Sequence, residues 1–302
     1  MVAQVLITGS QGFIGRSLRE YLTRKGYSVL GLDVCDGAEI KASILALDSL
    51  LPPLQDHRPS HVVHLAAISN PPACREDPLN CLNTNVLGTA NMLEVARRLG
   101  VERFVYLSSA NVYGPRPPLP VVEESPLSPR TVYDYSKVMA EKCVEAYRRV
   151  YGVPTVVFRS WKVFGEYDSP QSAISRFIDA CLRDGEITLY NGGRDVTDPY
   201  HVENLCHAIE LALRNENAVG EVFNVGTGNA LSIRELAELI KRLTSSNAPI
   251  SNAPPRSAEE AEPMISYPSI EKIRRLLGYR PIVSLEEGLM RQIRHRQRVL
   301  GF

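Results

Sequence analysis

The 302-residue chain lacks an excess of either charge, because its 34 Lys and Arg side chains balance 34 Asp and Glu side chains. This balance argues against a nucleic-acid-binding protein and against a polybasic membrane anchor, since both need a basic excess. No uncharged apolar run approaches the ~18 residues of a membrane span. Residues 1–8 lack the basic start and the small-residue cleavage site of a secretion signal. We therefore expect a folded protein that binds neither nucleic acid nor membranes.

Closely spaced cysteine pairs are also missing. The six cysteines are scattered, at positions 35, 74, 81, 143, 181 and 206. We therefore expect neither a disulfide framework nor a zinc site, and a reducing cytoplasmic location fits. The histidines at 57, 61 and 64 do not suggest a metal site either. His61 and His64 fall in an expected strand, where a three-residue offset points side chains to opposite faces.

What the sequence does contain is an alternation of short apolar runs with longer amphipathic ones. Residues 3–8 form the first expected strand, 13–25 the first expected helix and 28–34 the next strand. Such alternation indicates an α/β fold with a parallel sheet covered by helices on both faces. Further strands are expected at 61–66, 104–107, 155–158, 187–190 and 222–225, further helices at 79–99, 133–151, 175–183, 233–243, 270–277 and 285–299, and a loop at 245–263, which is rich in Ser, Asn, Ala and Pro.

Three glycines follow the first expected strand with the spacing Gly-x-x-Gly-x-x-Gly: Gly9, Gly12 and Gly15. Missing side chains let such a turn close tightly and let a pyrophosphate approach the backbone, and the following helix N-terminus adds free N–H groups and partial positive charge. Asp33 ends the second strand, 18 positions after Gly15. A carboxylate there can accept hydrogen bonds from both ribose hydroxyls and would repel a 2′-phosphate. The pattern predicts a bound dinucleotide, NAD rather than NADP.

Tyr133 and Lys137 open another expected helix and lie four residues apart, so they share one face. A nearby ammonium and the positive nicotinamide ring would both stabilise a phenolate, which would make Tyr133 a general base. Ser109 ends the strand that precedes this helix. Ligands of open α/β sheets bind beside the carboxyl ends of the strands, so we expect its hydroxyl to bond the reacting hydroxyl or carbonyl.

With these motifs in order, the chain resembles an extended short-chain dehydrogenase/reductase of the NAD-dependent epimerase/dehydratase (nucleotide-sugar) type. The resemblance continues at 64–67, 85–89, 108–114, 198–204, 223–226 and 276–281. It implies a Rossmann-type NAD-binding domain at 1–165, to which about 195–225 returns, and a smaller discontinuous substrate-binding domain at 166–302. It also implies tightly bound NAD, a Ser109–Tyr133–Lys137 catalytic set, and a homodimer formed through 79–99 and 133–151.

The glycine, Asp33 and Tyr-Lys arguments together with this resemblance give two sets of expected ligand contacts. The cofactor set is Gly9, Gly12, Phe13, Ile14, Gly15, Asp33, Ser43, Ile44, Leu65, Ala66, Ala67, Asn85, Ser108, Tyr133 and Lys137. The set for a nucleotide-sugar or other hydroxylated substrate is Ser69, Ser109, Asn111, Lys162, Arg194 and Arg256.

Three departures from the family pattern bear on the reaction. Ala110 and Asn111 stand where dehydratases of the family carry an Asp-Glu pair, so dehydration is disfavoured and a 4-epimerase is favoured. Lys162 replaces an Asn that touches the substrate diphosphate, and Thr197 replaces a phosphate-gripping Arg. These two changes keep open a ketosugar reductase or a sugar or polyol dehydrogenase with net redox change. A non-catalytic NAD-binding protein is a further alternative.

Overall fold

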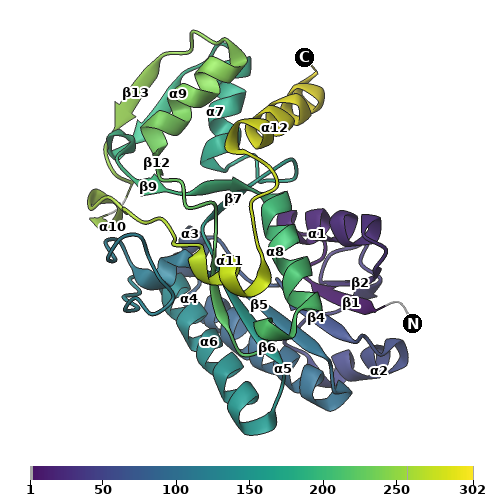
Figure 1. The fold of residues 1–302 in the computed structure, drawn as a ribbon. Helices are drawn as coiled ribbons and strands as arrows, with labels where there is room; N and C mark the ends of the chain where they lie inside the picture. The colour runs from purple at the N-terminus through teal and green to yellow at the C-terminus, as the bar shows by residue number, and fades with distance from the viewer. Residues whose placement is uncertain (1–2, 257, 302) are drawn as a thin grey trace.

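A seven-stranded parallel sheet organises the larger of two lobes in the computed structural model, which describes residues 3–256 and 258–301 (Figure 1). The strands, in spatial order, are β11 (Val222–Val225), β6 (Thr155–Ser160), β5 (Arg103–Ser109), β4 (His61–His64), β1 (Gln4–Thr8), β2 (Ser28–Asp33) and β3 (Ile40–Lys41). Every neighbouring pair in this sheet is parallel. The predicted α/β fold with a Rossmann-type parallel sheet is confirmed.

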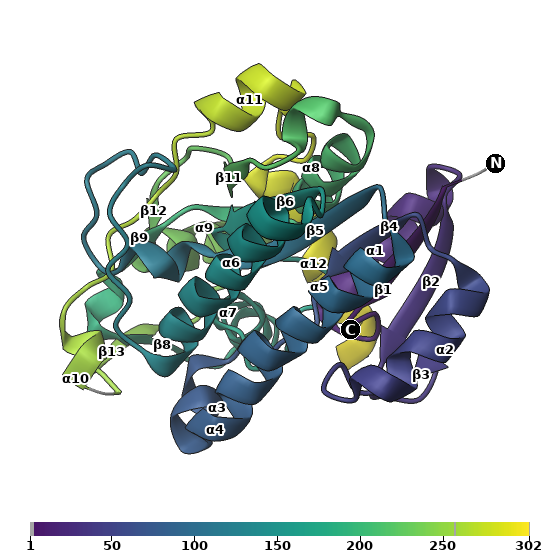
Figure 2. The ribbon, with the colours of Figure 1, turned by 90° about the horizontal axis from the view of Figure 1, so that it is seen from below.

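Helices cover both faces of this sheet (Figure 2). One face packs α1 (Phe13–Arg24), α8 (Val202–Arg214) and α11 (Glu271–Leu277), and the other packs α2 (Leu47–His57), α5 (Gly88–Leu99) and α6 (Val132–Tyr151). Because strand side chains alternate in direction, Ile7 points into the first core and Leu6 into the second. Burial of apolar side chains on both faces explains why these strands are nearly continuous hydrophobic runs.

The smaller lobe is built from α7 (Ala173–Leu182), α9 (Ile233–Thr244) and α12 (Leu285–Leu300) around a third apolar core. Three two-stranded sheets border it: β7 (Lys162–Phe164) with β10 (Pro199–His201), β8 (Ile187–Tyr190) with β13 (Ile250–Ala253), and β9 (Val196–Thr197) with β12 (Leu231–Ser232). The C-terminus lies in this lobe and the N-terminus in the other (Figure 1). The remaining short elements are α3 (Pro71–Glu76), α4 (Pro78–Leu82), η1 (Asn83–Leu87), η2 (Ala110–Tyr113), η3 (Asn191–Gly193), η4 (Glu216–Ala218) and α10 (Ala258–Ala261).

Several elements differ from the expectations. The expected loop at 245–263 contains β13 and the short helix α10. The strand β13 forms because it pairs in parallel with the distant β8. The expected helix at 79–99 is a succession of α4, a π-helical turn η1, and α5. Helices α2, α3 and α8 were not predicted, and α2 carries two prolines within its length.

The cysteine expectation is wrong at one pair. Cys74 and Cys81 form a disulfide that joins α3 to α4, with their Cα atoms 5.1 Å apart. The two short helices meet at Asp77, and this turn brings together side chains that are seven residues apart in the sequence. The argument from scattered cysteines to a reducing compartment therefore fails for this pair, and the cytoplasmic location stays a prediction.

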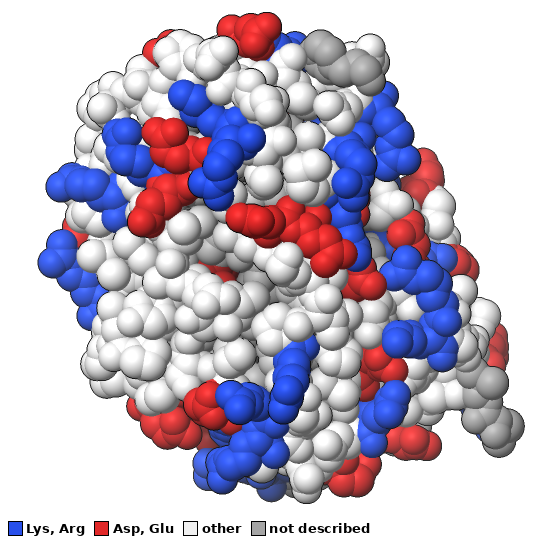
Figure 3. Space-filling view, turned by 45° about the horizontal axis from the view of Figure 1, so that its top comes forward, with Lys and Arg blue, Asp and Glu red and all other residues white. Residues whose placement is uncertain are grey.

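Charged side chains of both signs are interspersed on the face shown in Figure 3, around a broad area that carries few of them. This distribution agrees with the zero net charge of the sequence. Within residues 3–256 and 258–301, no helix has both the length and the apolar composition needed to cross a membrane.

Candidate active site

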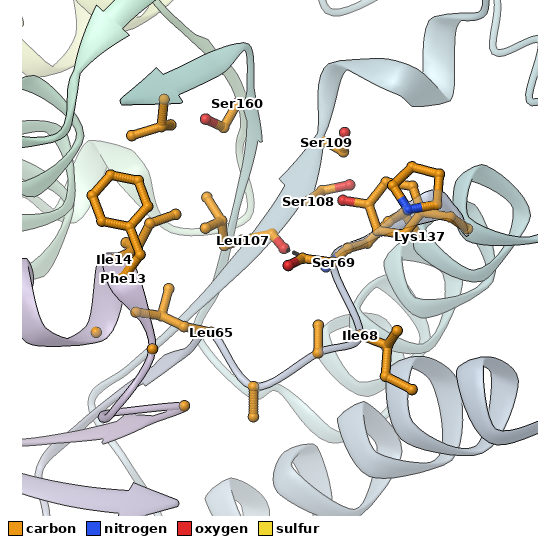
Figure 4. A pocket seen from close by; sticks show the side chains of 18 of the residues that line it. Phe13, Ile14, Leu65, Ile68, Ser69, Leu107, Ser108, Ser109, Lys137 and Ser160 are labelled. Carbon is orange, nitrogen blue, oxygen red and sulfur yellow. Dashed lines mark hydrogen bonds between the residues drawn. The ribbon is translucent and has the colours of Figure 1, made fainter. Parts of the chain in front are cut away.

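A cavity of about 990 Å³ opens at the carboxyl ends of β1, β2, β4, β5 and β6 and takes lining residues from both lobes. This is the edge of a parallel sheet at which ligands bind in open α/β folds. Figure 4 shows Phe13 and Ile14 on one side of the cavity and Ser108, Ser109 and Lys137 on the other. The cavity therefore joins the glycine turn to the predicted catalytic set.

The glycine turn brings backbone, not side chains, to the cavity. Gly9 has a positive φ of 70°, and a Cβ there would stand 2.8 Å from the Ala66 amide nitrogen. A Cβ on Gly15 would collide with the Gly9 carbonyl oxygen. The N-cap of α1 is Gly12, with no side-chain hydrogen bond, so the first N–H groups of the helix remain available to an anion. This arrangement fits a pyrophosphate.

Two backbone amides fix the orientation of the Asp33 carboxylate at the end of β2. Its carboxylate accepts hydrogen bonds from the Gln11 amide at 2.9 Å and the Cys35 amide at 3.1 Å. The carboxylate borders the same cavity as the glycine turn. A carboxylate at this place fits a ribose with two free hydroxyls, so the residues present suit NAD.

A capping box starts α6 just before the two residues of the predicted catalytic set that lie on this helix. The Thr131 hydroxyl accepts the Asp134 amide, and the Asp134 carboxylate accepts the Thr131 amide at 2.9 Å. Tyr133 and Lys137 follow on one face, with the Lys137 Nζ 5.9 Å from the centre of the Tyr133 ring. The Nζ donates a hydrogen bond to the Leu107 carbonyl oxygen at 3.0 Å. Both side chains are buried, at 7% and 5% exposure.

Burial dominates the ionisation of both groups. It raises the pKa of Tyr133 to about 12, against a hydrogen bond from Ser109 that lowers this pKa. Burial lowers the pKa of Lys137 to about 8, while the Glu141 carboxylate acts in the opposite direction. Without a bound ligand Tyr133 is therefore a phenol, and a positive charge placed beside it would favour the phenolate.

Most of the residues expected at the site line this one cavity. From the cofactor set these are Gly9, Gly12, Phe13, Ile14, Gly15, Asp33, Ser43, Ile44, Leu65, Ala66, Ala67, Ser108, Tyr133 and Lys137, and from the substrate set Ser69, Ser109, Asn111 and Lys162.

Three expected residues do not line the cavity. Asn85 is buried behind it, where its side chain hydrogen-bonds the Ile68 backbone N–H and carbonyl. Arg194 bonds the Asn191 carbonyl at 3.1 Å, and Arg256 lies over the Tyr190 ring with its guanidinium carbon 4.8 Å from the ring centre. Asn85 thus holds the backbone of Ile68, which lines the cavity, and both arginines lie away from the cavity lining.

Other lining residues were missed. Trp161 borders the cavity and donates from its indole nitrogen to the Ser266 hydroxyl at 3.1 Å. Asp195, Ile233 and Met264 also contribute. Trp161 stands beside Lys162 in the sequence, so its position offered a signal, whereas residues 195, 233, 264 and 266 reach the cavity only through the tertiary fold.

The fold and the site, a cavity lined by the glycine turn, Asp33, Ser109, Tyr133 and Lys137, are those of an NAD-binding enzyme. The model of the NAD dependent epimerase/dehydratase family matches residues 5–226. The chain belongs to this family, and it is an NAD-dependent enzyme of the extended short-chain dehydrogenase/reductase type.

Named relatives span nearly the whole chain. The UDP-glucuronic acid decarboxylase 1 of Xenopus tropicalis is 32% identical over 98% of this chain and 73% of its own length. The UDP-glucuronate 4-epimerase of Thermodesulfobacterium geofontis is 29% identical over 95% of this chain and 94% of its own length. The crystal structure of UDP-glucose 4-epimerase with UDP-glucose from Thermotoga maritima superposes with a TM-score of 0.92 at 28% identity, covering 98% of this chain and 99% of that one. The family members similar to this chain therefore differ in the reaction they are named for.

Proposed function

We propose that this protein is a 4-epimerase of a nucleotide-linked sugar, with a UDP- or dTDP-sugar as substrate. NAD, when bound, supplies the acceptor and donor of the hydride. Tyr133, as phenolate, removes the proton of the sugar 4-hydroxyl, and the Ser109 hydroxyl hydrogen-bonds the same oxygen. Lys137 stabilises the phenolate by its charge. After the 4-keto sugar has turned over, Tyr133 returns the proton.

The observation that carries this proposal is the composition of the wall next to Ser109. Ser109, Tyr133 and Lys137 line the cavity together, and the next two residues, Ala110 and Asn111, line it without a carboxyl group. Elimination of water needs an acid and a base besides the tyrosine. A 4-epimerisation needs only one group that moves a proton to and from a single oxygen.

Turnover of a panel of UDP- and dTDP-sugars tests the proposal, with no NAD added beyond what copurifies. We expect a 4-epimeric product, detected by anion-exchange chromatography, with no net change in NADH absorbance. Tyr133→Phe, which keeps the ring and loses the hydroxyl, is the matched control. Absence of product across the panel would contradict the proposal.

A second function is favoured by the charges in the cavity. Among the described lining residues the cations are Lys137 and Lys162, and Lys137 belongs to the catalytic end. Lys162 is then the single lining cation available to phosphate or carboxylate groups of the substrate. This favours a dehydrogenase or reductase of a smaller anionic sugar or polyol. Stoichiometric formation or consumption of NADH would support this second function over epimerisation.

We also propose that two copies pair through α4, η1 and α6. Large apolar side chains on these adjacent elements are exposed, with Leu79 at 72%, Leu87 at 50%, Tyr135 at 49% and Met139 at 46%. Burial of such a group against an identical one forms a two-fold interface.

A further inference from the structure

A buried ion pair lies behind the catalytic set, and the reaction as proposed does not use it. Glu141 and Arg159 are both 8% exposed in their side chains, and the Arg159 Nη2 lies 2.7 Å from a Glu141 carboxylate oxygen. The Arg159 Nε lies 3.1 Å from the other oxygen, so the contact is bidentate. A buried pair of this kind is weak evidence of stabilisation, because desolvation offsets the attraction. The other hydrogen bonds of Glu141 and Arg159 indicate a further role.

Glu141 continues the catalytic row of α6. It follows Lys137 by four residues, as Lys137 follows Tyr133, so the three side chains occupy one face of the helix. The Glu141 carboxylate accepts the Ser108 hydroxyl at 2.5 Å. Ser108 is itself buried, at 4% exposure.

Ser108 stands between the two β5 residues that hold the catalytic side chains. The carbonyl of Leu107 accepts the Lys137 ammonium at 3.0 Å. The hydroxyl of Ser109 lines the cavity together with Tyr133 and lowers the pKa of the Tyr133 phenol. A bond that fixes Ser108 therefore fixes, through one peptide unit on each side, the partners of both groups.

Arg159 joins this arrangement to the neighbouring loops. Its Nη1 donates to the Tyr113 hydroxyl at 2.8 Å and to the Glu123 carbonyl at 3.0 Å. The Tyr113 hydroxyl donates to Asn224 on β11 at 2.7 Å. The carboxylate of Glu141 is thus held by an arginine that is itself anchored at two further points.

From this geometry we infer that Glu141 is a positioning residue, which holds the end of β5 through Ser108 so that Leu107 and Ser109 keep Lys137 and Tyr133 in place for proton transfer. The inference rests on the proposed proton-transfer role of Tyr133, although not on the identity of the sugar. Arg159 neutralises the carboxylate and sets its orientation.

Other ionisable groups around Lys137 do not supply this function. Tyr106 on β5 has its ring centre 5.2 Å from the Nζ, and burial holds its pKa well above the usual value. His64 on β4 is neutral, because burial and then the charge of Lys137 lower its pKa to about 3. Glu141, which raises the pKa of Lys137, and Tyr133 are the groups on α6 itself.

Two neutral double variants separate positioning from charge. Glu141→Met/Arg159→Met removes both charges and the acceptor for Ser108, whereas Glu141→Gln/Arg159→Gln removes both charges and keeps an acceptor. The readout is the pKa of Tyr133 in the NAD-loaded protein. It is obtained by titrating the tyrosinate absorbance of each variant with pH and subtracting the same titration of that variant with Tyr133→Phe added. This readout needs no substrate, so it decides the inference even if no sugar turns over.

We expect the methionine pair to raise the Tyr133 pKa by about one unit, and with it to lower kcat about tenfold near neutral pH at an unchanged KM. The glutamine pair should recover most of both losses. Ser108→Ala, which breaks the same bond from the other side and leaves the ion pair intact, should match the methionine pair. It also decides the case if that pair does not fold.

A matched control is the pair Asp179 and Arg296 in the smaller lobe, which are 23% and 9% exposed and lie outside the cavity lining. Asp179→Asn/Arg296→Met should lower stability without changing the Tyr133 titration. A folded methionine pair and a folded Ser108→Ala protein that both titrate like the wild type would overturn the inference, and the ion pair would then be structural only.

Discussion

The Lys137 ammonium donates to the Leu107 carbonyl oxygen at 3.0 Å, so helix α6 is tied to β5, the strand that ends at Ser109. Lys137 is thereby held with its Nζ 5.9 Å from the centre of the Tyr133 ring, where the proposed mechanism needs its charge. Replacing Tyr133 by Phe removes the group that moves the proton. We expect a loss of kcat of about 100-fold or more, the contribution typical of a general base. Steady-state turnover of the identified substrate measures it, and Tyr135→Phe, an exposed tyrosine on the same helix, is the control.

The buried ammonium of Lys137 should lower the free energy of unfolding. Burial lowers its pKa from 10.5 to about 8, so the unfolded chain binds this proton more tightly than the folded protein. The cost is complete below about pH 8, fades as the pH rises from there, and is gone above the unfolded value of 10.5. Lys137→Met should therefore raise the free energy of unfolding near neutral pH by ~1–3 kcal/mol, after allowance for the lost bond to Leu107. Urea unfolding should show the gain shrinking near pH 10, and equal destabilisation at both pH values would contradict the argument.

Asp33 should set the choice of cofactor. Its carboxylate is oriented by two backbone amides and faces the cavity, so it can accept both ribose hydroxyls. Asp33→Asn keeps the shape and removes the charge. We expect the Kd for NAD to rise about tenfold, and the preference over NADP to fall by more, because the repulsion of the 2′-phosphate is lost. Isothermal titration calorimetry of the cofactor-free protein measures both. An unchanged preference would rule out this role.

The disulfide between Cys74 and Cys81 closes a short loop beside Tyr133. Its opening by a dithiol reductant should lower the free energy of unfolding by about 2 kcal/mol, the value expected from chain entropy for a loop of this length. Urea unfolding with and without reductant measures the difference. Cys143→Ser should remain sensitive to the reductant, and Cys74→Ser/Cys81→Ser should not. Equal stability of the wild type in both conditions would contradict the prediction.

The proposed pairing surface can be tested by a single charge. Met139 is 46% exposed on α6, and an aspartate there would place like charges opposite each other in a two-fold interface. Met139→Asp should shift the protein from dimer to monomer in light scattering. Val299→Asp, at a similarly exposed position on α12, should leave the mass unchanged. A wild-type protein that is already monomeric would remove the basis of the proposal.

The sequence predicted the parts of the fold that depend on local pattern. The strands at the sheet centre follow from short continuous apolar runs, and the helices α1, α6 and α9 follow from apolar residues that recur with a period of 3.6. The prediction of a loop at 245–263 was wrong for β13, because this strand pairs with β8, whose residues lie 63 positions earlier, and no local pattern records such a pairing. Likewise the Cys74–Cys81 bond depends on how two short helices meet.

The candidate site likewise contains residues that local sequence pattern predicts and residues that only the tertiary fold brings to the cavity. Gly9, Asp33, Tyr133 and Lys137 stand on one edge of the sheet because the carboxyl ends of parallel strands and the starts of the following helices meet there. The resemblance and the sequence positions of Arg194 and Arg256 make them candidates to replace the Arg that is missing at Thr197, whereas their contacts with Asn191 and Tyr190 are properties of the smaller lobe. Met264 and Ser266 reach the cavity because Ile265 pairs with Val196 of β9.

The outer strand of the sheet has a consequence for synthesis. Residues 222–225 form β11 beside β6, and Tyr279 then bonds the Gly226 carbonyl at 3.0 Å. A chain that grows from its N-terminus can assemble β1 to β6 early, but it leaves the edge of β6 open until more than sixty further residues have emerged. An open edge of this kind can pair with another nascent chain. Ribosome-bound fragments ending before residue 222 should therefore depend most on chaperones.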